Sequence, residues 1–221
     1  MQNNLIIYGS GKFAEYIRYA FEYDSDYRVK AFCLEASYLS NLADQTQNGL
    51  EILNFNSLKN TYDPSNFELF IAIGNDALRE RIFNEAKSMG YKLASYVSSK
   101  ATVFEEIKIG KNVFISEDTG IQPFVEIGDN TIIIGSKIGH HTHIGNHVLL
   151  SISTIGANSY IGDNSFLGLN STIKPNTRIE KRNIIGMGCN ITKNTKENEV
   201  YSSTPAKRRN ISYGDLKDKY L

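Results

Sequence analysis

The chain has 221 residues and balances 24 Lys and Arg against 24 Asp and Glu, which gives a formal net charge of zero. Because no excess of charge steers nucleic acid or an anionic membrane to such a surface, the composition argues against both as partners. No apolar run approaches the ~20 residues of a membrane span, and the N-terminus lacks the basic region and apolar core of a secretion signal, so we expect a cytoplasmic protein.

The first half of the chain alternates between strand-like and helix-like periodicities. The apolar run over residues 5–8 predicts a strand that ends at a Gly-Ser-Gly turn, and Phe13, Ile17 and Phe21 follow at helical spacing. Strands alternating with helices are typical of a small parallel α/β sheet, so we expect a Rossmann-like domain over residues 1–97. The further expected elements are strands over 27–34, 67–73 and 91–97 and a helix over 79–89; the polar region 37–64 gives no clear periodicity.

A six-residue repeat of aliphatic residues runs from Val97 to Ile191 and slips by one residue after Ile133 and again after Leu150. A helix would scatter a six-residue period around its surface. Short strands separated by turns instead stack the aliphatic side chains inside a triangular prism, with three hexads to a coil. Several asparagines fall at the expected corners, where Asn tolerates left-handed backbone: Asn112, Asn130, Asn146, Asn158 and Asn164.

We therefore expect a parallel β-helix over residues 98–206 and a tail over residues 207–221. The two cysteines, Cys33 and Cys189, form no metal or redox spacing and are expected to be reduced and structural.

These features together resemble a known family. The hexads resemble the left-handed hexapeptide β-helix of acyltransferases. With the N-terminal segments YGSGKFAE and IAIGNDALRER and the tail motif STPAKR, nearly the whole chain is similar to the nucleotide-sugar acetyltransferases. These include the bacillosamine-pathway N-acetyltransferases and the sialic acid O-acetyltransferase-like proteins. The resemblance implies acetyl-CoA as donor, a nucleotide-linked sugar as acceptor, a role in surface polysaccharide or glycan synthesis, and a homotrimer with active sites between subunits.

All four histidines lie in one segment, HHTHIGNH, over residues 140–147. Imidazole accepts a proton near neutral pH, as acyl transfer from a thioester to an amine or hydroxyl requires. Such a transfer needs no covalent nucleophile when donor and acceptor are bound together and a backbone N–H stabilises the oxyanion. The alternative interpretation is that each histidine is an ordinary outward-facing hexad residue.

The resemblance indicates His140 and His141 as the catalytic candidates. The family has a His–acidic pair before the Ile-Gly step, and its histidine is the general base. His140 is the expected base here, and His141 stands where the family has the acidic residue; a base role for His141 itself stays open. The rival interpretation is a zinc site formed by His-His-X-His. Neighbouring side chains on an extended chain point to opposite faces, so no metal is expected.

Carrying the family's coenzyme A contacts over residue by residue gives Leu169, Gly186 and Met187, with Gly156 as a further candidate. Lys207 begins the only dense basic run, KRR, and is a candidate for the coenzyme's phosphates. The alternative is that these are ordinary coil residues and a solvated tail.

The Gly-Ser-Gly turn follows a strand and precedes a helix, which is the setting in which backbone N–H groups bind phosphate. A redox dinucleotide is not expected, because the rest of the chain has no second dehydrogenase domain. The resemblance instead implies a nucleotide-sugar site, whose candidates are Gly9, Ser10, Gly11, Lys12, Glu35, Gly74 and Asn75. The alternative is a purely structural βα turn.

The sequence thus favours an acetyl-CoA-dependent N-acetyltransferase of a nucleotide-linked amino sugar. A sugar O-acetyltransferase needs the same base and donor and stays open, as does a non-catalytic trimeric scaffold.

Overall fold

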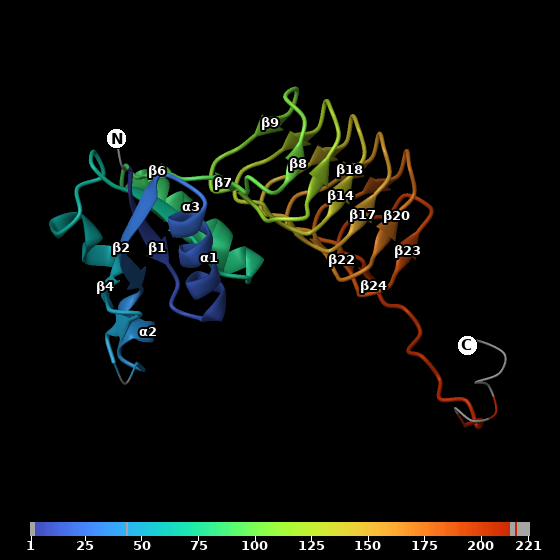
Figure 1. Ribbon diagram of the computed structural model, residues 1–221, viewed down its shortest axis with the longest axis horizontal. Helices are drawn as coiled ribbons and strands as arrows, with labels where there is room; N and C mark the ends of the chain where they lie inside the picture. The colour runs from blue at the N-terminus through green and yellow to red at the C-terminus, as the bar shows by residue number, and fades with distance from the viewer. Residues whose placement is uncertain (1–2, 43, 213–214, 216–221) are drawn as a thin grey trace.

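The computed structural model describes residues 3–42, 44–212 and 215, and it has an α/β domain followed by a β-helix (Figure 1). The sheet of the N-terminal domain has the order β3-β4-β2-β1-β5-β6, and all its neighbours pair in parallel except β3 and β4. The elements of this domain are β1 (Asn3–Tyr8), α1 (Lys12–Tyr23), β2 (Tyr27–Leu34), α2 (Ala36–Leu39), β3 (Thr46–Gln47), β4 (Leu50–Asn54), the 3-10 helix η1 (Phe55–Asn60), β5 (Glu68–Ile71), α3 (Asp76–Ser88) and β6 (Lys92–Leu93).

The Rossmann-like arrangement expected from the sequence is confirmed, with two differences. The strand expected over residues 91–97 is divided: β6 completes the N-terminal sheet, whereas β7 (Tyr96–Val97) pairs with β10 of the β-helix. The region 37–64, which gave no periodicity, contains the remainder of α2 together with β3, β4 and η1. Strand β4 has only Ile52 buried among its five residues, so its alternation is too weak to recognise in the sequence.

The second half is a left-handed β-helix of three parallel sheets. The first sheet contains β7, β10 (Phe114–Ile115), β13 (Ile132–Ile134), β16 (Leu149–Ser151), β19 (Phe166–Leu167), β22 (Ile184–Ile185) and β24 (Val200–Tyr201). The second contains β8 (Thr102–Val103), β11 (Gly120–Ile121), β14 (Lys137–Ile138), β17 (Thr154–Ile155), β20 (Thr172–Ile173) and β23 (Asn190–Ile191). The third contains β9 (Lys108–Ile109), β12 (Glu126–Ile127), β15 (His143–Ile144), β18 (Tyr160–Ile161) and β21 (Arg178–Ile179).

The hexad aliphatic residues line the inside of this prism, as expected. Ile144, Ile161 and Ile179 are fully buried and stack in register on consecutive coils. The two slips in the repeat are coils of 17 residues, from Ile133 to Leu150 and from Leu150 to Leu167, whereas the coils directly before and after them have 18 residues. In both coils the missing residue lies between the first and second sheets, where a three-residue strand is followed by a turn of only two residues.

Left-handed residues mark the corners, and four of the five asparagines expected there are among them. Asn146 is the exception, because the left-handed position in its coil is His147, with φ of 60°. The side chain of Asn146 instead accepts a hydrogen bond from the Asp129 N–H of the preceding coil at 2.8 Å. Its place one residue before the corner therefore serves to join successive coils.

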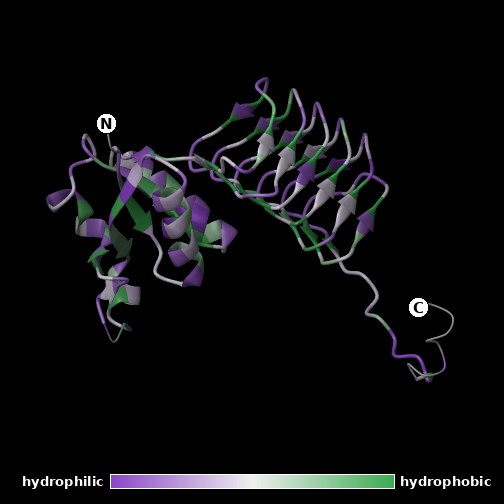
Figure 2. Cartoon of the chain, in the orientation of Figure 1, coloured by the Kyte–Doolittle hydropathy of each residue, from purple (hydrophilic) through white to green (hydrophobic). Residues whose placement is uncertain are grey.

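The outer face of the first sheet of the β-helix packs against the N-terminal domain. Phe114 and Ile132 belong to the hydrophobic core of that domain, although they lie on β-helix strands. Further along, the outer face becomes exposed at Phe166, Ile184 and Val200. Figure 2 shows this sheet as a hydrophobic band along the β-helix. After β24 the chain leaves the prism as an extended tail (Figure 1).

Candidate active site

His140 and His141 form an exposed turn at the corner between the second and third sheets. Their Nδ1 atoms lie 3.0 Å apart, within hydrogen-bond distance, and the His141 ring lies 4.7 Å from that of Phe124. The expectation that the two side chains point to opposite faces is wrong. The pair lies in a turn with His141 at φ of 56°, not on an extended strand, so the rings meet.

The Nδ1 contact has a chemical consequence. Between two neutral imidazoles, one Nδ1 must donate and the other accept. The donating ring then carries its lone pair on Nε2, which is the atom that can accept a proton. The backbone N–H of His140 donates to Gln122 Oε1 at 2.9 Å and holds the turn against the preceding coil. The arrangement can therefore orient one imidazole as a base.

The other two histidines have different surroundings. His143 lies on the outer face of the third sheet, 3.5 Å from the Glu126 carboxylate and stacked on Tyr160. His147 lies in the junction between the two domains. Over residues 3–42, 44–212 and 215, no group of three or more His, Cys, Asp or Glu side chains converges as a metal site would require.

A shallow groove of about 540 Å³ covers the outer face of the second sheet. It begins beside the histidine turn, at Gln122 and Gly139, and continues to Gly156 on the next coil. Small outer residues such as Thr102 and Gly120 leave this space open. Of the expected coenzyme A residues, the groove thus includes Gly156.

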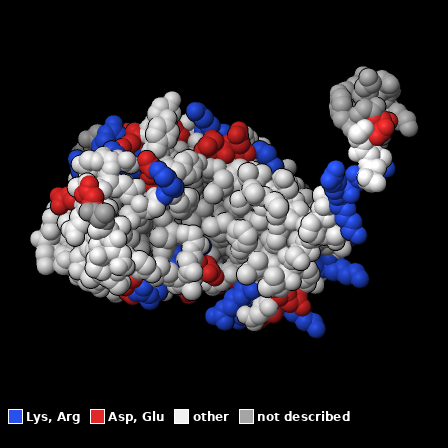
Figure 3. Space-filling model, turned by 90° about the horizontal axis from the view of Figure 1, so that it is seen from below, with Lys and Arg blue, Asp and Glu red and all other residues white. Residues whose placement is uncertain are grey.

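The other donor candidates lie at the opposite edge of the second sheet. Leu169 and Met187 are exposed on consecutive coils there, and the Gly188 N–H donates to the Leu169 carbonyl oxygen at 2.8 Å. A Cβ at Gly186 would lie 2.8 Å from the Tyr201 carbonyl oxygen, so this glycine is needed for coil stacking. Lys207 is exposed in the tail, which carries basic side chains away from the prism in Figure 3.

The glycine turn of the N-terminal domain opens onto two adjoining cavities, of about 350 and 410 Å³, and Ser10 and Gly11 line both. Gly9 lines one and Lys12 the other. Gly9 has φ of +127°, and a Cβ there would lie 2.8 Å from the Ala72 carbonyl oxygen. The turn therefore requires glycine at this position to pack against the end of β5.

Glu35 is placed differently from the other nucleotide candidates. Its carboxylate accepts two hydrogen bonds from Arg81, at 2.7 and 2.9 Å, and one from the Tyr8 hydroxyl. The hydrogen bonds from Arg81 hold the pKa of Glu35 below its usual range. Glu35 lines neither of the two cavities, since its side chain is held by Arg81.

Gly74 and Asn75 line a third cavity, of about 220 Å³, between α3 and the β-helix. Asn75 caps α3 by accepting a hydrogen bond from the Leu78 N–H at 2.9 Å. The opposite wall comes from the β-helix and includes His147 and Phe166. These two candidates therefore line a cavity at the domain junction, whereas the adjacent Ile73 lines a cavity of the glycine turn.

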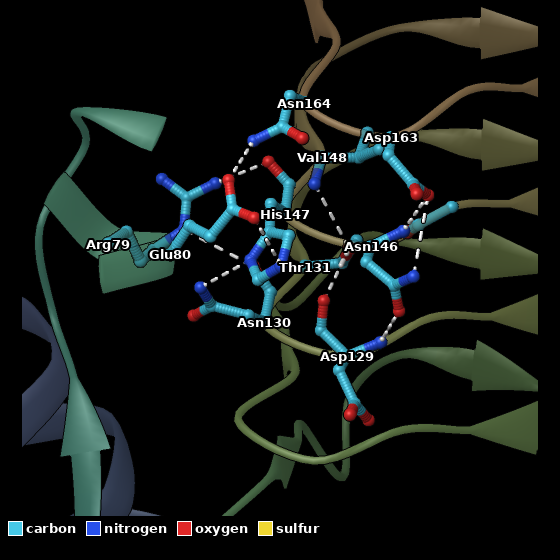
Figure 4. A network of polar contacts seen from close by, with 11 residues as sticks. Arg79, Glu80, Asp129, Asn130, Thr131, Asn146, His147, Val148, Asp163 and Asn164 are labelled. Atoms are coloured by element: carbon cyan, nitrogen blue, oxygen red, sulfur yellow. Dashed lines mark hydrogen bonds and ion pairs between the residues drawn. The ribbon is translucent and has the colours of Figure 1, made fainter. Parts of the chain in front are cut away.

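The junction contains a polar network that the sequence did not indicate (Figure 4). Asn112 donates to Asn130, and the Asn130 side-chain amide donates to His147 Nδ1 at 2.8 Å. His147 Nε2 therefore carries the proton of the neutral ring and faces Glu80 at 3.8 Å. Burial lowers the pKa of His147 from its usual 6.5, and the carboxylate of Glu80 acts in the opposite direction.

Arg79 is the buried cation of this network, and it too was not predicted. The helical periodicity was the available signal, because Arg79 shares the buried face of α3 with Ile82 and Phe83, at i+3 and i+4, whereas the exposed Arg81 lies off that face. Only the approach of two coil corners more than fifty residues further along the chain buries its side chain.

No helix in the described part of the chain has the length and apolar character needed to cross a membrane.

Two family models match the sequence. Residues 4–86 match the PglD N-terminal domain, and residues 92–201 match the GMPPB C-terminal domain. No curated protein matches the sequence.

Several solved structures are similar over nearly the whole chain. The acetyltransferase domain of PglB from Neisseria gonorrhoeae has a TM-score of 0.81 at 22% identity, with 93% of this chain and 99% of that chain covered. PerB from Caulobacter crescentus, in complex with CoA and GDP-perosamine, has a TM-score of 0.82 at 22% identity, with 93% and 96% covered. WeeI from Acinetobacter baumannii has a TM-score of 0.78 at 22% identity, with 93% and 99% covered.

These matches establish the fold and the order of the two domains, and they confirm the resemblance expected from the sequence. The chain has the two-domain architecture of these three structures, an α/β domain followed by a β-helix.

Proposed function

We propose that the chain is an acetyl-CoA-dependent N-acetyltransferase that acts on a nucleotide-linked amino sugar in the cytoplasm, for surface polysaccharide or glycan synthesis. The observation that carries this proposal is the hydrogen-bonded His140–His141 turn beside the groove on the second sheet. PerB, a protein of the same fold, has been solved with CoA and GDP-perosamine bound, which supports the choice of donor and acceptor class.

In the proposed reaction, the sugar amine attacks the thioester carbonyl carbon, so that an N–C bond forms and the C–S bond breaks. His140 donates from Nδ1 to His141 and uses its Nε2 lone pair to take the proton that the amine loses. The proton then passes to the sulfur of the departing coenzyme A thiolate. His141 holds the ring of His140 in this orientation, in place of the acidic residue that the family has there.

The donor is proposed to lie along the second sheet, near Gly156 at one edge and Leu169, Gly186 and Met187 at the other. Lys207 is proposed to bind its phosphates. The nucleotide is proposed to lie at the glycine turn, where the N–H groups of Gly11 and Lys12 at the start of α1 favour phosphate.

A thiol-release assay with acetyl-CoA tests the reaction, using matched nucleotide sugars that carry either an amine or a hydroxyl at the same carbon. We expect free thiol only with the amino sugar. Release only with the hydroxy sugar would show an O-acetyltransferase, and release with neither across a panel of nucleotides would favour the non-catalytic scaffold.

We further propose that the active protein is a homotrimer whose sites lie between subunits. His140 lies at the corner between the second and third sheets, whereas the N-terminal domain is attached at the corner between the third and first sheets, through Asn130 and His147. One chain therefore holds the proposed base and the proposed acceptor site on different edges of the prism. The exposed apolar face at Phe166, Ile184 and Val200 is available for packing against a second copy.

Mixing two inactive variants tests this arrangement. His140→Ala removes the base, and Gly11→Glu places a negative charge in the nucleotide cavity, at a position where an added Cβ meets no atom within 4 Å. Refolding the two together should restore about a quarter of the wild-type rate, because random assembly joins an intact base to an intact acceptor site in about one site in four. No recovery, or a monomeric mass in sedimentation equilibrium, would contradict the proposal.

A further inference from the structure

Arg79 is completely buried at the junction of the two domains. Its guanidinium donates to four backbone carbonyl oxygens: Nε to Asn130 at 3.2 Å, one terminal nitrogen to Ile73 at 3.2 Å and Gly74 at 3.0 Å, and the other to His147 at 2.7 Å. Within the described residues it forms no ion pair, and the neighbouring Glu80 carboxylate is directed to His147 and Asn164 instead.

A buried charge without a carboxylate partner must be stabilised by dipoles. Burial lowers the pKa of Arg79 to about 10, so the side chain still carries its positive charge at neutral pH. Four carbonyl oxygens around one planar group provide the negative ends of those dipoles. The charge is therefore held in a cage made only of main-chain atoms.

The four carbonyl groups come from the two domains, two from each. Ile73 and Gly74 lie directly after β5 and lead into Asn75, which lines the junction cavity. Asn130 and His147 are the left-handed corner residues of two consecutive coils, and the second of these coils carries His140. One side chain thus joins the Gly74–Asn75 edge of the N-terminal domain to two corners of its own β-helix.

Arginine is the side chain that this cage requires. Its N–H groups lie in a fixed plane and point in several directions at once, whereas lysine has one nitrogen with three donors on a flexible stem. A lysine at this position keeps the charge but cannot reach four carbonyl oxygens on both sides of the junction.

We propose that Arg79 is a positioning residue that fixes the Gly74–Asn75 edge of the N-terminal domain on its own β-helix, and thereby fixes the acceptor relative to the histidines of the neighbouring copy in the proposed trimer. The proposal rests on the proposed function for its kinetic consequence. Its structural part, that Arg79 orders this edge, stands independently of any activity.

The test compares Arg79→Lys with Arg28→Lys. Arg28 also donates to backbone carbonyl oxygens, those of Glu22 and Tyr27, but within the N-terminal domain. In Arg79→Lys we expect kcat to fall by about 100-fold with a higher KM for the nucleotide sugar, since small misplacements of bound reactants have effects of this size. The KM for acetyl-CoA should stay within about twofold, because the groove lies on the β-helix. Arg28→Lys should match the wild type.

Hydrogen exchange of the same variants supplies a readout that does not depend on catalysis. Backbone amides of residues 72–79 and 145–149 should exchange faster in Arg79→Lys, while those of residues 160–191 should be unchanged. Wild-type kinetics or wild-type hydrogen exchange in Arg79→Lys would overturn the proposal. A lower kcat accompanied by equal increases in KM for both substrates would overturn it as well. If wild-type protein transfers no acetyl group, the proposed function fails, and the exchange result still decides the role of Arg79.

A measurement on the unmodified protein covers the case in which Arg79→Lys does not fold. The Arg79 Nε–H should exchange with water at least about 100-fold more slowly than that of Arg28 in nitrogen-15 spectra, because the hydrogen bond to Asn130 is buried. Equal exchange rates for the two arginines would show that the cage does not persist in solution.

Discussion

The left-handed corner position gives the histidines their separate environments. His141 and His147 both occupy this position, which other coils fill with asparagine, for example Asn158 and Asn164. Each corner directs its own side chain toward a different neighbour: the His141 ring meets His140, and the His147 ring enters the domain junction. The same local conformation therefore produces an exposed pair suited to catalysis and a buried ring suited to holding domains together.

Gly9→Ala should destabilise the protein. The substitution imposes an L side chain on a backbone with φ of +127° and places its Cβ 2.8 Å from the Ala72 carbonyl oxygen. We expect the free energy of unfolding to fall by about 1–3 kcal/mol in urea titrations, the range for strained backbone. Gly74→Ala is the control, because its φ is not in the left-handed range and a Cβ there meets no atom within 4 Å. Equal stability of the two variants would contradict this account.

His147 should make stability depend on pH. Burial lowers its pKa in the folded protein below the usual 6.5, while the unfolded chain titrates near 6.5. Below about pH 6.5 the unfolded state therefore binds a proton that the folded state does not, and the free energy of unfolding falls as the pH falls. The groups facing the ring are Glu80, Asn130 and Phe83, with Asp129, Asp163 and Arg79 nearby.

The matched variant is His147→Asn, because asparagine takes the same left-handed position in neighbouring coils. Urea unfolding at pH 7.5 and pH 5.5 should show a smaller loss of stability on acidification in this variant than in the wild type. An identical loss in both proteins would show that His147 does not contribute.

At the level of single residues, the sequence predicts only part of the candidate site. The tandem His140–His141 and the Gly-Ser-Gly turn are local patterns, so they can be recognised without coordinates. That the two histidine rings meet depends on the left-handed turn, for which asparagine is a clearer signal than histidine. Arg79 lies on the apolar face of its helix, but its partners could not be predicted, since two of the carbonyl groups that it binds belong to another domain.

Among the elements, the stacked coils of the β-helix are expected to unfold together. Ile161 is fully buried and pairs in register with Ile144 and Ile179 on the neighbouring coils. Ile161→Ala should lower the free energy of unfolding by about 2–5 kcal/mol, as expected for a cavity in a packed core.

The control for this substitution is Ile211→Ala in the tail, where the side chain is 42% exposed. It should lower the free energy of unfolding by about 1 kcal/mol or less. A comparable loss in the two variants by calorimetry would show that the hexad ladder does not form the core.

The two halves of the chain differ in how well their elements can be predicted. The β-helix repeats one short pattern many times, so even the two 17-residue coils appear as slips in the spacing of Ile133, Leu150 and Leu167. In the N-terminal domain each element occurs once, and short strands such as β4 have too few buried residues to form a pattern. The division of residues 91–97 between two sheets depends on pairing partners distant in sequence.

For the whole molecule, the two domains are joined by shared packing and a polar junction. Phe114 belongs to the core of the N-terminal domain, the side-chain oxygen of Asn112 accepts a hydrogen bond from the Ile71 N–H, and Arg79 joins the domains through main-chain oxygens. A rigid junction of this kind holds the N-terminal domain in one position on its β-helix. In the proposed trimer, the acceptor would then meet the donor and base of a neighbouring copy in a fixed geometry, on which catalysis by proximity depends.

The rate of acetyl transfer in His140→Ala, compared with His143→Ala, tests the central claim most directly. Both histidines are solvent-accessible members of the same segment, but His143 stacks on Tyr160 and lies outside the proposed site. With saturating acetyl-CoA and an amino nucleotide sugar, His140→Ala should lose about 100-fold or more in kcat, the range for removal of a general base. His143→Ala should keep most of the activity. Near-wild-type transfer by His140→Ala in a folded protein would contradict the account.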